Sequence, residues 1–275
     1  MRVALAERAP VLGDLDANLA AVRATVAAVP ADLVVFPELY LSGYKLGDRF
    51  HRAAERFADL GASPVGAVAE ETHRSVVVGL PLPSPDRPGE VANAVALVRP
   101  DRSVAVQVKR YLPTYGPFEE GATFTPTDTS APVAFPGGPL GLLICYDVFF
   151  PEVSQQLAMA GAACLVAVSA SPVTSGPLFQ KLLPARAVEN ALPVVYVNRV
   201  GVEDGIVFGG GSGAWDARGE RLPATTAPVP GLGPDESVTV VEIDLGDAPR
   251  WRPFRPVLRD RAARPARRRG DAAPA

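Results

Sequence analysis

Short apolar runs alternate with longer segments of helical periodicity along most of the chain. The segments 14–29, 48–73, 151–161 and 177–191 carry apolar residues at helical spacing, and Gly61 divides the second into two predicted helices. After a first run at the N-terminus, the continuous apolar runs that predict strands are LVVF, SVVVGL, GLLI, CLVAV and VVYV. Runs without polar alternation are typical of strands covered on both faces of a sheet. The alternation of strands with helices favours an α/β fold.

Further strands are predicted in pairs that short turns connect. The paired segments are 91–100 with 103–113, 132–136 with 139–145, and, as a hairpin-rich sheet edge, 211–221 with 236–245. Segment 192–201 is predicted as one strand. Because a short turn joins antiparallel neighbours and a helical crossover joins parallel ones, the sheets are predicted to be mixed.

The composition describes a chain that can bury a large core. Of 275 residues 48% are hydrophobic and 21% charged, which excludes an intrinsically disordered protein. Two cysteines and two histidines give neither a disulfide framework nor zinc-ligand spacing, so no metal or cofactor is expected. No apolar run is long enough to cross a membrane, and the first ten residues lack the apolar run of a signal peptide. We therefore expect a cytoplasmic protein without membrane contact.

Positive charge is concentrated at the C-terminal end. From Arg250 onward there are nine arginines and two aspartates, whereas the preceding 249 residues carry 18 Lys and Arg against 28 Asp and Glu. No linker or internal repeat occurs before this point. Residues 1–249 are therefore predicted to form a single domain, and 250–275 a C-terminal basic segment that is disordered after about residue 262. Because the body is acidic, no nucleic-acid partner is expected.

Three chemically reactive side chains each follow an apolar strand. Cys145 lies between a strand and a helix, where helix-start amides favour a thiolate and supply donors for an oxyanion. Glu38 follows a buried run, where a carboxylate with little water around it can act as a general base. Lys109 ends a strand and can stabilise an oxyanion. Taken singly, each has a structural alternative: a buried thiol, a turn-capping glutamate and an exposed lysine. Cys164, which begins an apolar strand, is interpreted as structural.

Ligands in open α/β sheets bind outside the carboxyl ends of the strands, so the common placement of these three residues has functional meaning. Together they supply a nucleophile, a base and a cation without histidine. The scarcity of histidine disfavours Ser-His-Asp and Cys-His enzymes but not this combination.

The segments that carry these residues resemble motifs of the nitrilase, or carbon–nitrogen hydrolase, superfamily. The matching segments are LVVFPELYLSGY, VKRYLPTYGPFEE, GLLICYDVFFPEV and, near the end, WRPFRPVLRDR. The resemblance implies a four-layer α-β-β-α sandwich and a catalytic triad of Glu38, Lys109 and Cys145. It also implies a supporting glutamate, assigned to Glu120 with Glu119 as the alternative. Members of the superfamily usually pair, so the resemblance implies a homodimer or a larger homo-oligomer.

The same resemblance implies a mechanism and a substrate class. Cys145 would attack a small linear carboxamide, Lys109 and the backbone N–H of Tyr146 would hold the oxyanion, and a thioester would form as ammonia leaves. Segments around 108–120, 169–172 and 185–201 resemble the glutaminase half of glutamine-dependent NAD synthetases. No SGGxDS-type nucleotide loop is present, so we expect an amidase that acts alone or supplies a separate ammonia-accepting synthetase.

Four residues are expected to contact the substrate on the strength of this resemblance. They are Tyr115, Ser169, Ser171 and Arg186, although Tyr115 could instead pack its loop and Arg186 could be a surface charge. A nitrilase and an N-carbamoyl hydrolase are alternative functions, because both use the same triad. A non-catalytic scaffold is disfavoured because the triad is intact.

Overall fold

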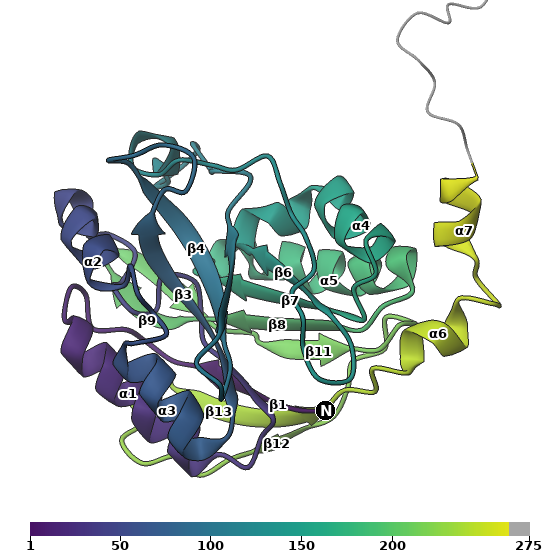
Figure 1. Cartoon of the computed structure of the whole chain (residues 1–275), viewed down its shortest axis with the longest axis horizontal. Helices are drawn as coiled ribbons and strands as arrows, with labels where there is room; N and C mark the ends of the chain where they lie inside the picture. Colours follow the sequence, from purple (N-terminus) through teal and green to yellow (C-terminus); the bar gives the residue numbers. More distant parts are fainter. Residues whose placement is uncertain (264–275) are drawn as a thin grey trace, which may run out of the picture.

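Two β-sheets form the centre of the computed structural model, which describes residues 1–263. Helices lie on the outer sides of both sheets (Figure 1). The predicted α/β class and the predicted mixed sheets are confirmed. The disorder predicted after about residue 262 falls on residues 264–275, which lie outside the described part of the chain.

The larger sheet has seven strands. Their order is β12 (Ala224–Thr226), β13 (Ser237–Glu242), β1 (Arg2–Glu7), β2 (Leu33–Val35), β3 (Ser75–Pro83), β4 (Val91–Val98) and β5 (Val104–Val108). Strands β1, β2 and β3 are parallel, and the remaining neighbours are antiparallel. The carboxyl ends of β2 and β3 therefore meet at one edge.

The smaller sheet has four strands. Their order is β11 (Gly213–Trp215), β8 (Val194–Asn198), β7 (Cys164–Ser169) and β6 (Leu140–Ile144). Strands β6, β7 and β8 are parallel, and β11 is antiparallel to β8. A separate hairpin joins β9 (Val200–Glu203) to β10 (Ile206–Gly209).

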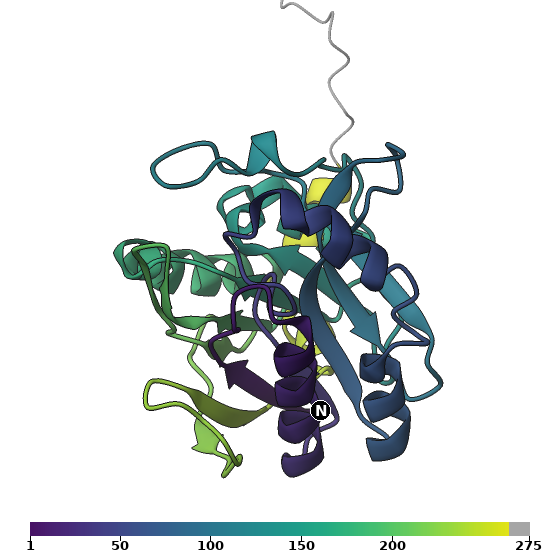
Figure 2. The ribbon, with the colours of Figure 1, turned by 90° about the vertical axis from the view of Figure 1, so that its left-hand side faces the viewer.

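The helices pack against these sheets in two groups. Helices α1 (Leu15–Ala28) and α3 (Pro64–Thr72) lie side by side against the larger sheet, and α4 (Pro151–Met159) and α5 (Gly176–Asn190) against the smaller one (Figures 1 and 2). The other helices are α2 (Phe50–Arg56), α6 (Asp247–Trp251) and α7 (Val257–Ala262), the last in contact with α4 and α5. The break predicted near Gly61 separates α2 from α3.

Three apolar clusters explain this packing. Val77 of β3 and Val166 of β7 belong to a cluster that fills the space between the two sheets. A second cluster joins the larger sheet to α1 and α3, and a third joins the smaller sheet to α4 and α5. Strands that are apolar on both sides thus have an apolar layer on each face.

Three strand predictions need correction. In segment 132–136 only Val133 pairs, in an isolated bridge to Leu140, because the flanking prolines have no N–H to extend a ladder. Segment 192–201 divides into β8 and β9, which belong to different sheets. Segments 211–221 and 236–245 also lie in different sheets, and β13 is not an edge strand because β12 pairs on its outer side.

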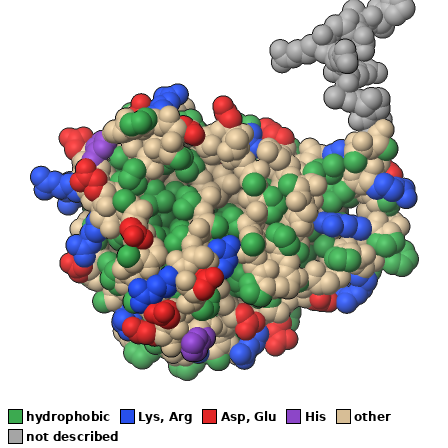
Figure 3. Space-filling view, in the orientation of Figure 1, with side chains coloured by type: hydrophobic (Ala, Val, Ile, Leu, Met, Phe, Trp, Pro, Cys, Tyr) green, Lys and Arg blue, Asp and Glu red, His purple; other side chains and the backbone are tan. Residues whose placement is uncertain are grey.

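Charged groups of both signs are interspersed over the face that Figure 3 displays. Within residues 1–263, no helix is long and apolar enough to cross a membrane. His51 and His73 are exposed.

Candidate active site

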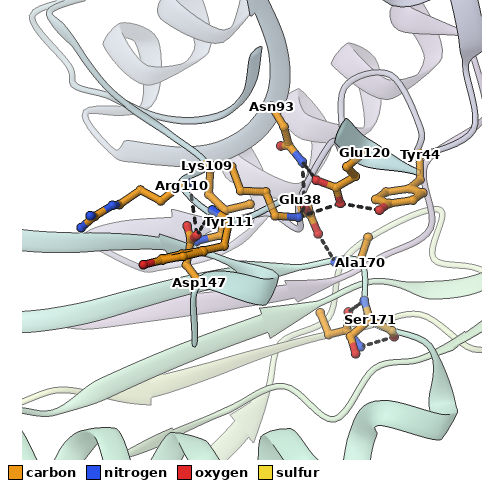
Figure 4. A network of polar contacts seen from close by, with 12 residues as sticks. Glu38, Tyr44, Asn93, Lys109, Arg110, Tyr111, Glu120, Asp147, Ala170 and Ser171 are labelled. Carbon is orange, nitrogen blue, oxygen red and sulfur yellow. Dashed lines mark hydrogen bonds and ion pairs between the residues drawn. The ribbon is translucent and has the colours of Figure 1, made fainter. Parts of the chain in front are cut away.

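Strand ends from both sheets bring the predicted catalytic residues to one place. Glu38 follows β2, Lys109 follows β5, and Cys145 follows β6. A fourth contribution comes from the end of β7, where Ala170 faces Glu38 (Figure 4).

Glu38 is held by donors on both of its carboxylate oxygens. Its Oε1 accepts hydrogen bonds from Lys109 Nζ at 2.6 Å and from Asn93 Nδ2 at 2.8 Å. Its Oε2 accepts from the backbone N–H of Ala170 at 2.8 Å. The side chain is completely buried, so it is not the surface glutamate of the structural alternative. The turn that carries it lies directly against Gly79 of β3.

Lys109 is completely buried between two carboxylates. Its Nζ lies 2.6 Å from Glu38 Oε1 and 2.7 Å from Glu120 Oε1. Burial alone lowers the pKa of Lys109, but the charges of Glu120 and Glu38 outweigh it and raise the pKa above its ordinary value. Lys109 is therefore a fixed cation and not an ordinary exposed lysine.

Glu120, rather than Glu119, contacts Lys109. It lies in a short 3₁₀ turn, Glu120–Ala122, and also accepts hydrogen bonds from the hydroxyl of Tyr44 and, at 3.4 Å, from Asn93. Burial raises the pKa of Glu120, and the charge of Lys109 opposes this change. The site thus pairs one cation with two carboxylates.

Cys145 begins the 3₁₀ turn Cys145–Phe149 with a left-handed backbone, φ 46°. Burial raises the pKa of its thiol, and the charge of Glu38 raises it further, while the Lys109 charge and the Ser169 hydroxyl lower it. The pKa stays above its ordinary value, so the thiol is protonated at neutral pH and needs a base before it can attack. Cys164, in contrast, is fully buried within the core between the sheets.

Asp147 connects the cysteine turn to the lysine segment. Its carboxylate accepts hydrogen bonds from the backbone N–H groups of Arg110 at 3.1 Å, Tyr111 at 2.9 Å and Ile144 at 3.2 Å. Burial raises the pKa of Asp147 to about 7, against the opposing effect of the Lys109 charge. Asp147 therefore fixes the relative position of two segments that each carry a residue of the predicted triad.

A small cavity opens above Cys145. Its volume of about 10 Å³ is close to what one water molecule needs. Three of the residues expected at the site line it: Tyr115, Tyr146 and Ser171. The full lining comprises Tyr44, Pro113, Tyr115, Phe118, Cys145, Tyr146, Phe149, Ser171, Pro172, Ser175 and Phe179.

The other two expected substrate contacts lie elsewhere. Ser169 is fully buried at the end of β7, its hydroxyl has no hydrogen-bond partner among the described residues, and it does not line the cavity. Arg186 donates to the carbonyl oxygens of Val148 at 2.8 Å and Phe149 at 3.3 Å, and it does not line the cavity. Its position therefore supports the backbone that follows the cysteine, in place of the substrate contact expected from the resemblance.

Three residues of the network were not predicted. Asn93 could have been noticed as the single polar residue in the buried strand VANAVALV, and Asp147 as an acidic residue two positions after the cysteine. Tyr44 closes the segment LVVFPELYLSGY, but no pattern within that segment indicates that its hydroxyl would reach Glu120.

Residues 2–253 match the family of carbon–nitrogen hydrolases. The chain belongs to this family. The resemblance to the nitrilase superfamily, and the prediction that the protein is an enzyme of this hydrolase class, are thereby confirmed.

Relatives of this carbon–nitrogen hydrolase include amidases and synthetases. An (R)-stereoselective amidase from Pseudomonas sp. is 34% identical, with 95% of this chain and 91% of the amidase covered. A glutamine-dependent NAD(+) synthetase from Rhodobacter capsulatus is 32% identical over 91% of this chain, which spans only 45% of that synthetase. Of these two similarities, the one to the amidase extends over nearly the whole length of both proteins.

Solved structures with the same fold cover almost the whole chain. A carbon–nitrogen hydrolase from Helicobacter pylori G27 has a TM-score of 0.81 and 25% identity, with 94% of each chain covered. An amidase from Nesterenkonia sp. AN1 has a TM-score of 0.76 and 31% identity, with 96% of this chain and 97% of that one covered. The solved structure is that of a mutant of the Nesterenkonia amidase, in which acrylamide has added to the active site cysteine.

Proposed function

We propose that this carbon–nitrogen hydrolase is a cysteine-dependent amidase that cleaves the C–N bond of a small linear carboxamide and releases ammonia. The observation that supports it best is the buried Lys109 ammonium, 2.6 Å from Glu38 and 2.7 Å from Glu120. Such an ion cluster is costly to bury and is typical of sites where charge develops during a reaction. The amidase relatives support the same reaction class.

In the proposed acylation step, Glu38 accepts the thiol proton as Cys145 Sγ bonds to the carbonyl carbon. The C=O electron pair moves onto oxygen, where Lys109 and the backbone N–H of Tyr146 stabilise the negative charge. The C–N bond then breaks, Glu38 returns the proton to nitrogen, and ammonia leaves behind a thioester. The raised pKa of the thiol makes the base necessary, because the free thiol carries no charge at neutral pH.

In the proposed deacylation step, Glu38 removes a proton from water as the water oxygen attacks the thioester carbon. The C–S bond breaks, the carboxylic acid leaves, and the thiolate recovers its proton from Glu38. Glu120 keeps Lys109 in place through both steps and, with Asn93, orients the Glu38 carboxylate.

Several finer properties belong to the same proposal. We propose a nitrilase-type, four-layer α-β-β-α sandwich, which the helix, sheet, sheet and helix packing of the three apolar clusters supports. We also propose a homo-oligomer that pairs through α4 and α5, where Met159, Leu178 and Val188 are exposed apolar side chains. A cytoplasmic location and a separate ammonia-accepting synthetase stay predictions.

The test is ammonia release from purified protein. Acetamide, propionamide, glutamine, a short nitrile and an N-carbamoyl amino acid are compared for the wild type, Cys145→Ala and Cys164→Ala. We expect release from an amide that Cys145→Ala abolishes and Cys164→Ala preserves, with circular dichroism confirming that both variants fold. Hydroxylamine should intercept the thioester as a hydroxamate. Activity that survives in Cys145→Ala, or turnover confined to the nitrile or the carbamoyl compound, would contradict the proposal.

A further inference from the structure

More than half of the residues that line the cavity above Cys145 are aromatic. Six of the eleven carry aromatic rings, and no Lys, Arg, Asp or Glu belongs to the lining within the described residues. The rings pack on one another, as Tyr115 does with Tyr146 at 5.4 Å and Phe149 with Phe179 at 5.3 Å between ring centroids. An acyl group held above the cysteine would therefore be surrounded by hydrocarbon.

The polar groups of this lining are neutral. The hydroxyl of Tyr44 donates a hydrogen bond to Glu120 and is therefore already occupied. Ser171 is buried, and its hydroxyl has no hydrogen-bond partner among the described residues. Asn198 fixes the Ser171 backbone, accepting from its N–H at 2.8 Å and donating to its carbonyl at 3.0 Å. A neutral hydroxyl in this position can bind an amide or a hydroxyl group but cannot balance a full negative charge.

The charged groups next to the cavity make an anion still less favourable. The carboxylates of Glu38 and Glu120 both pair with the ammonium group of Lys109. This cation is therefore already shared between two anions. With a protonated thiol, the cluster therefore has an excess of negative charge. A substrate carboxylate near it would be repelled and would lose its water without gaining a partner.

On the basis of the proposed amidase function, we propose that this enzyme accepts amides with a short, uncharged acyl group and rejects amides whose acyl chain carries a carboxylate, glutamine included. The aromatic surface of the lining favours an uncharged acyl group. The absence of a cation in the lining limits its charge. The proposed rejection of glutamine would distinguish this chain from the glutamine-dependent synthetases among its relatives, and it follows from the uncharged lining of the cavity.

Matched substrates isolate the charge from the size. Pentanamide and glutaramate have the same chain length, but pentanamide ends in a methyl group and glutaramate in a carboxylate. Glutaramide is the neutral isostere of glutaramate. We expect kcat/KM to be about 100-fold or more higher for pentanamide than for glutaramate, since the site offers the carboxylate no partner. Glutaramide should lie much closer to pentanamide, and glutamine should behave like glutaramate.

Matched variants identify the lining as the cause. Ser175 lies in the lining and is partly exposed, whereas its neighbour Thr174 is exposed and outside it. Ser175→Arg adds a cation to the lining and should reduce the ratio of kcat/KM for pentanamide to kcat/KM for glutaramate about tenfold. Thr174→Arg adds the same charge outside the cavity and should leave the ratio unchanged. Circular dichroism and pentanamide turnover would show that both variants fold.

The outcomes separate this proposal from the proposed function. If glutaramate or glutamine is hydrolysed as efficiently as pentanamide in a Cys145-dependent reaction, the substrate proposal is wrong and the amidase function stands. An equal change of the ratio in both arginine variants would likewise overturn the role of the lining. If no amide is hydrolysed and hydroxylamine intercepts no acyl group, the proposed function fails and the substrate proposal fails with it.

Discussion

Replacing Asn93 by alanine tests whether the carboxylates of the site depend on a neutral donor between them. Asn93 is completely buried in β4, and its Nδ2 lies 2.8 Å from Glu38 Oε1 and 3.4 Å from Glu120 Oε2. Its amide oxygen has no hydrogen-bond partner among the described residues, so the two carboxylates alone orient the group. Removal of this donor leaves Glu38 with Lys109 and Ala170.

The expected loss follows from the stronger of the two hydrogen bonds. A hydrogen bond to a charged group contributes roughly 1.5–3 kcal/mol, and the 3.4 Å contact to Glu120 adds little. If the reaction needs that orientation of Glu38, kcat/KM for the best amide should fall about 10- to 150-fold in Asn93→Ala.

A second buried asparagine provides the control for this experiment. Asn190 in α5 is also completely buried, and its Nδ2 donates to the Arg186 carbonyl at 2.9 Å, away from the triad. Asn190→Ala should lower the melting temperature as Asn93→Ala does but leave kcat/KM close to that of the wild type. A kcat/KM within twofold of the wild type in Asn93→Ala would refute this account of the site.

Two other substitutions probe the backbone that carries the triad. A Cβ on Gly79 would lie 2.4 Å from the carbonyl oxygen of Pro37, so Gly79→Ala should lower both the melting temperature and kcat. A Cβ on Gly176 would meet no atom within 4 Å, so Gly176→Ala should change neither quantity. Equal effects in the two variants would contradict this reasoning. For Asp147, burial raises the pKa to about 7 from about 3.9 in an unfolded chain, so its stabilising contribution is complete below pH 4 and disappears as the pH rises through 7. The free energy of unfolding of the wild type, measured against Asp147→Asn in urea, should fall by up to about 4 kcal/mol across that window, and a constant difference would disprove it.

The central strands were predictable from the sequence because burial on both faces makes them continuously apolar. Strand β12 was not, because its residues Ala224–Thr226 are exposed and carry no hydrophobic pattern. The separation of β8 from β9 was also missed, since their apolar residues continue on both sides of Arg199, which is itself buried over the ring of Phe208. Hydrophobic patterns record how deeply a segment is buried but not which neighbour it pairs with.

The residues of the proposed triad could be singled out in the sequence for a different reason, and their surroundings could not. Each of the three lies in a motif of its own. The burial of Lys109, however, depends on Glu38, which is 71 positions away in the sequence, and the donor on the other Glu38 oxygen is 132 positions away. Contacts over such separations depend on how the two sheets pack, and no local pattern records that packing.

Directional contacts at the active site set the relative position of the two sheets. The cluster between the sheets consists of apolar side chains, and hydrophobic burial has no preferred direction. The hydrogen bond from Ala170 of the smaller sheet to Glu38 of the larger, and those from Arg110 and Tyr111 to Asp147, are directional and lie beside the triad. A displacement of one sheet relative to the other would break these bonds and separate Glu38 from Cys145. Activity should consequently be more sensitive than stability to substitutions in the layer between the sheets.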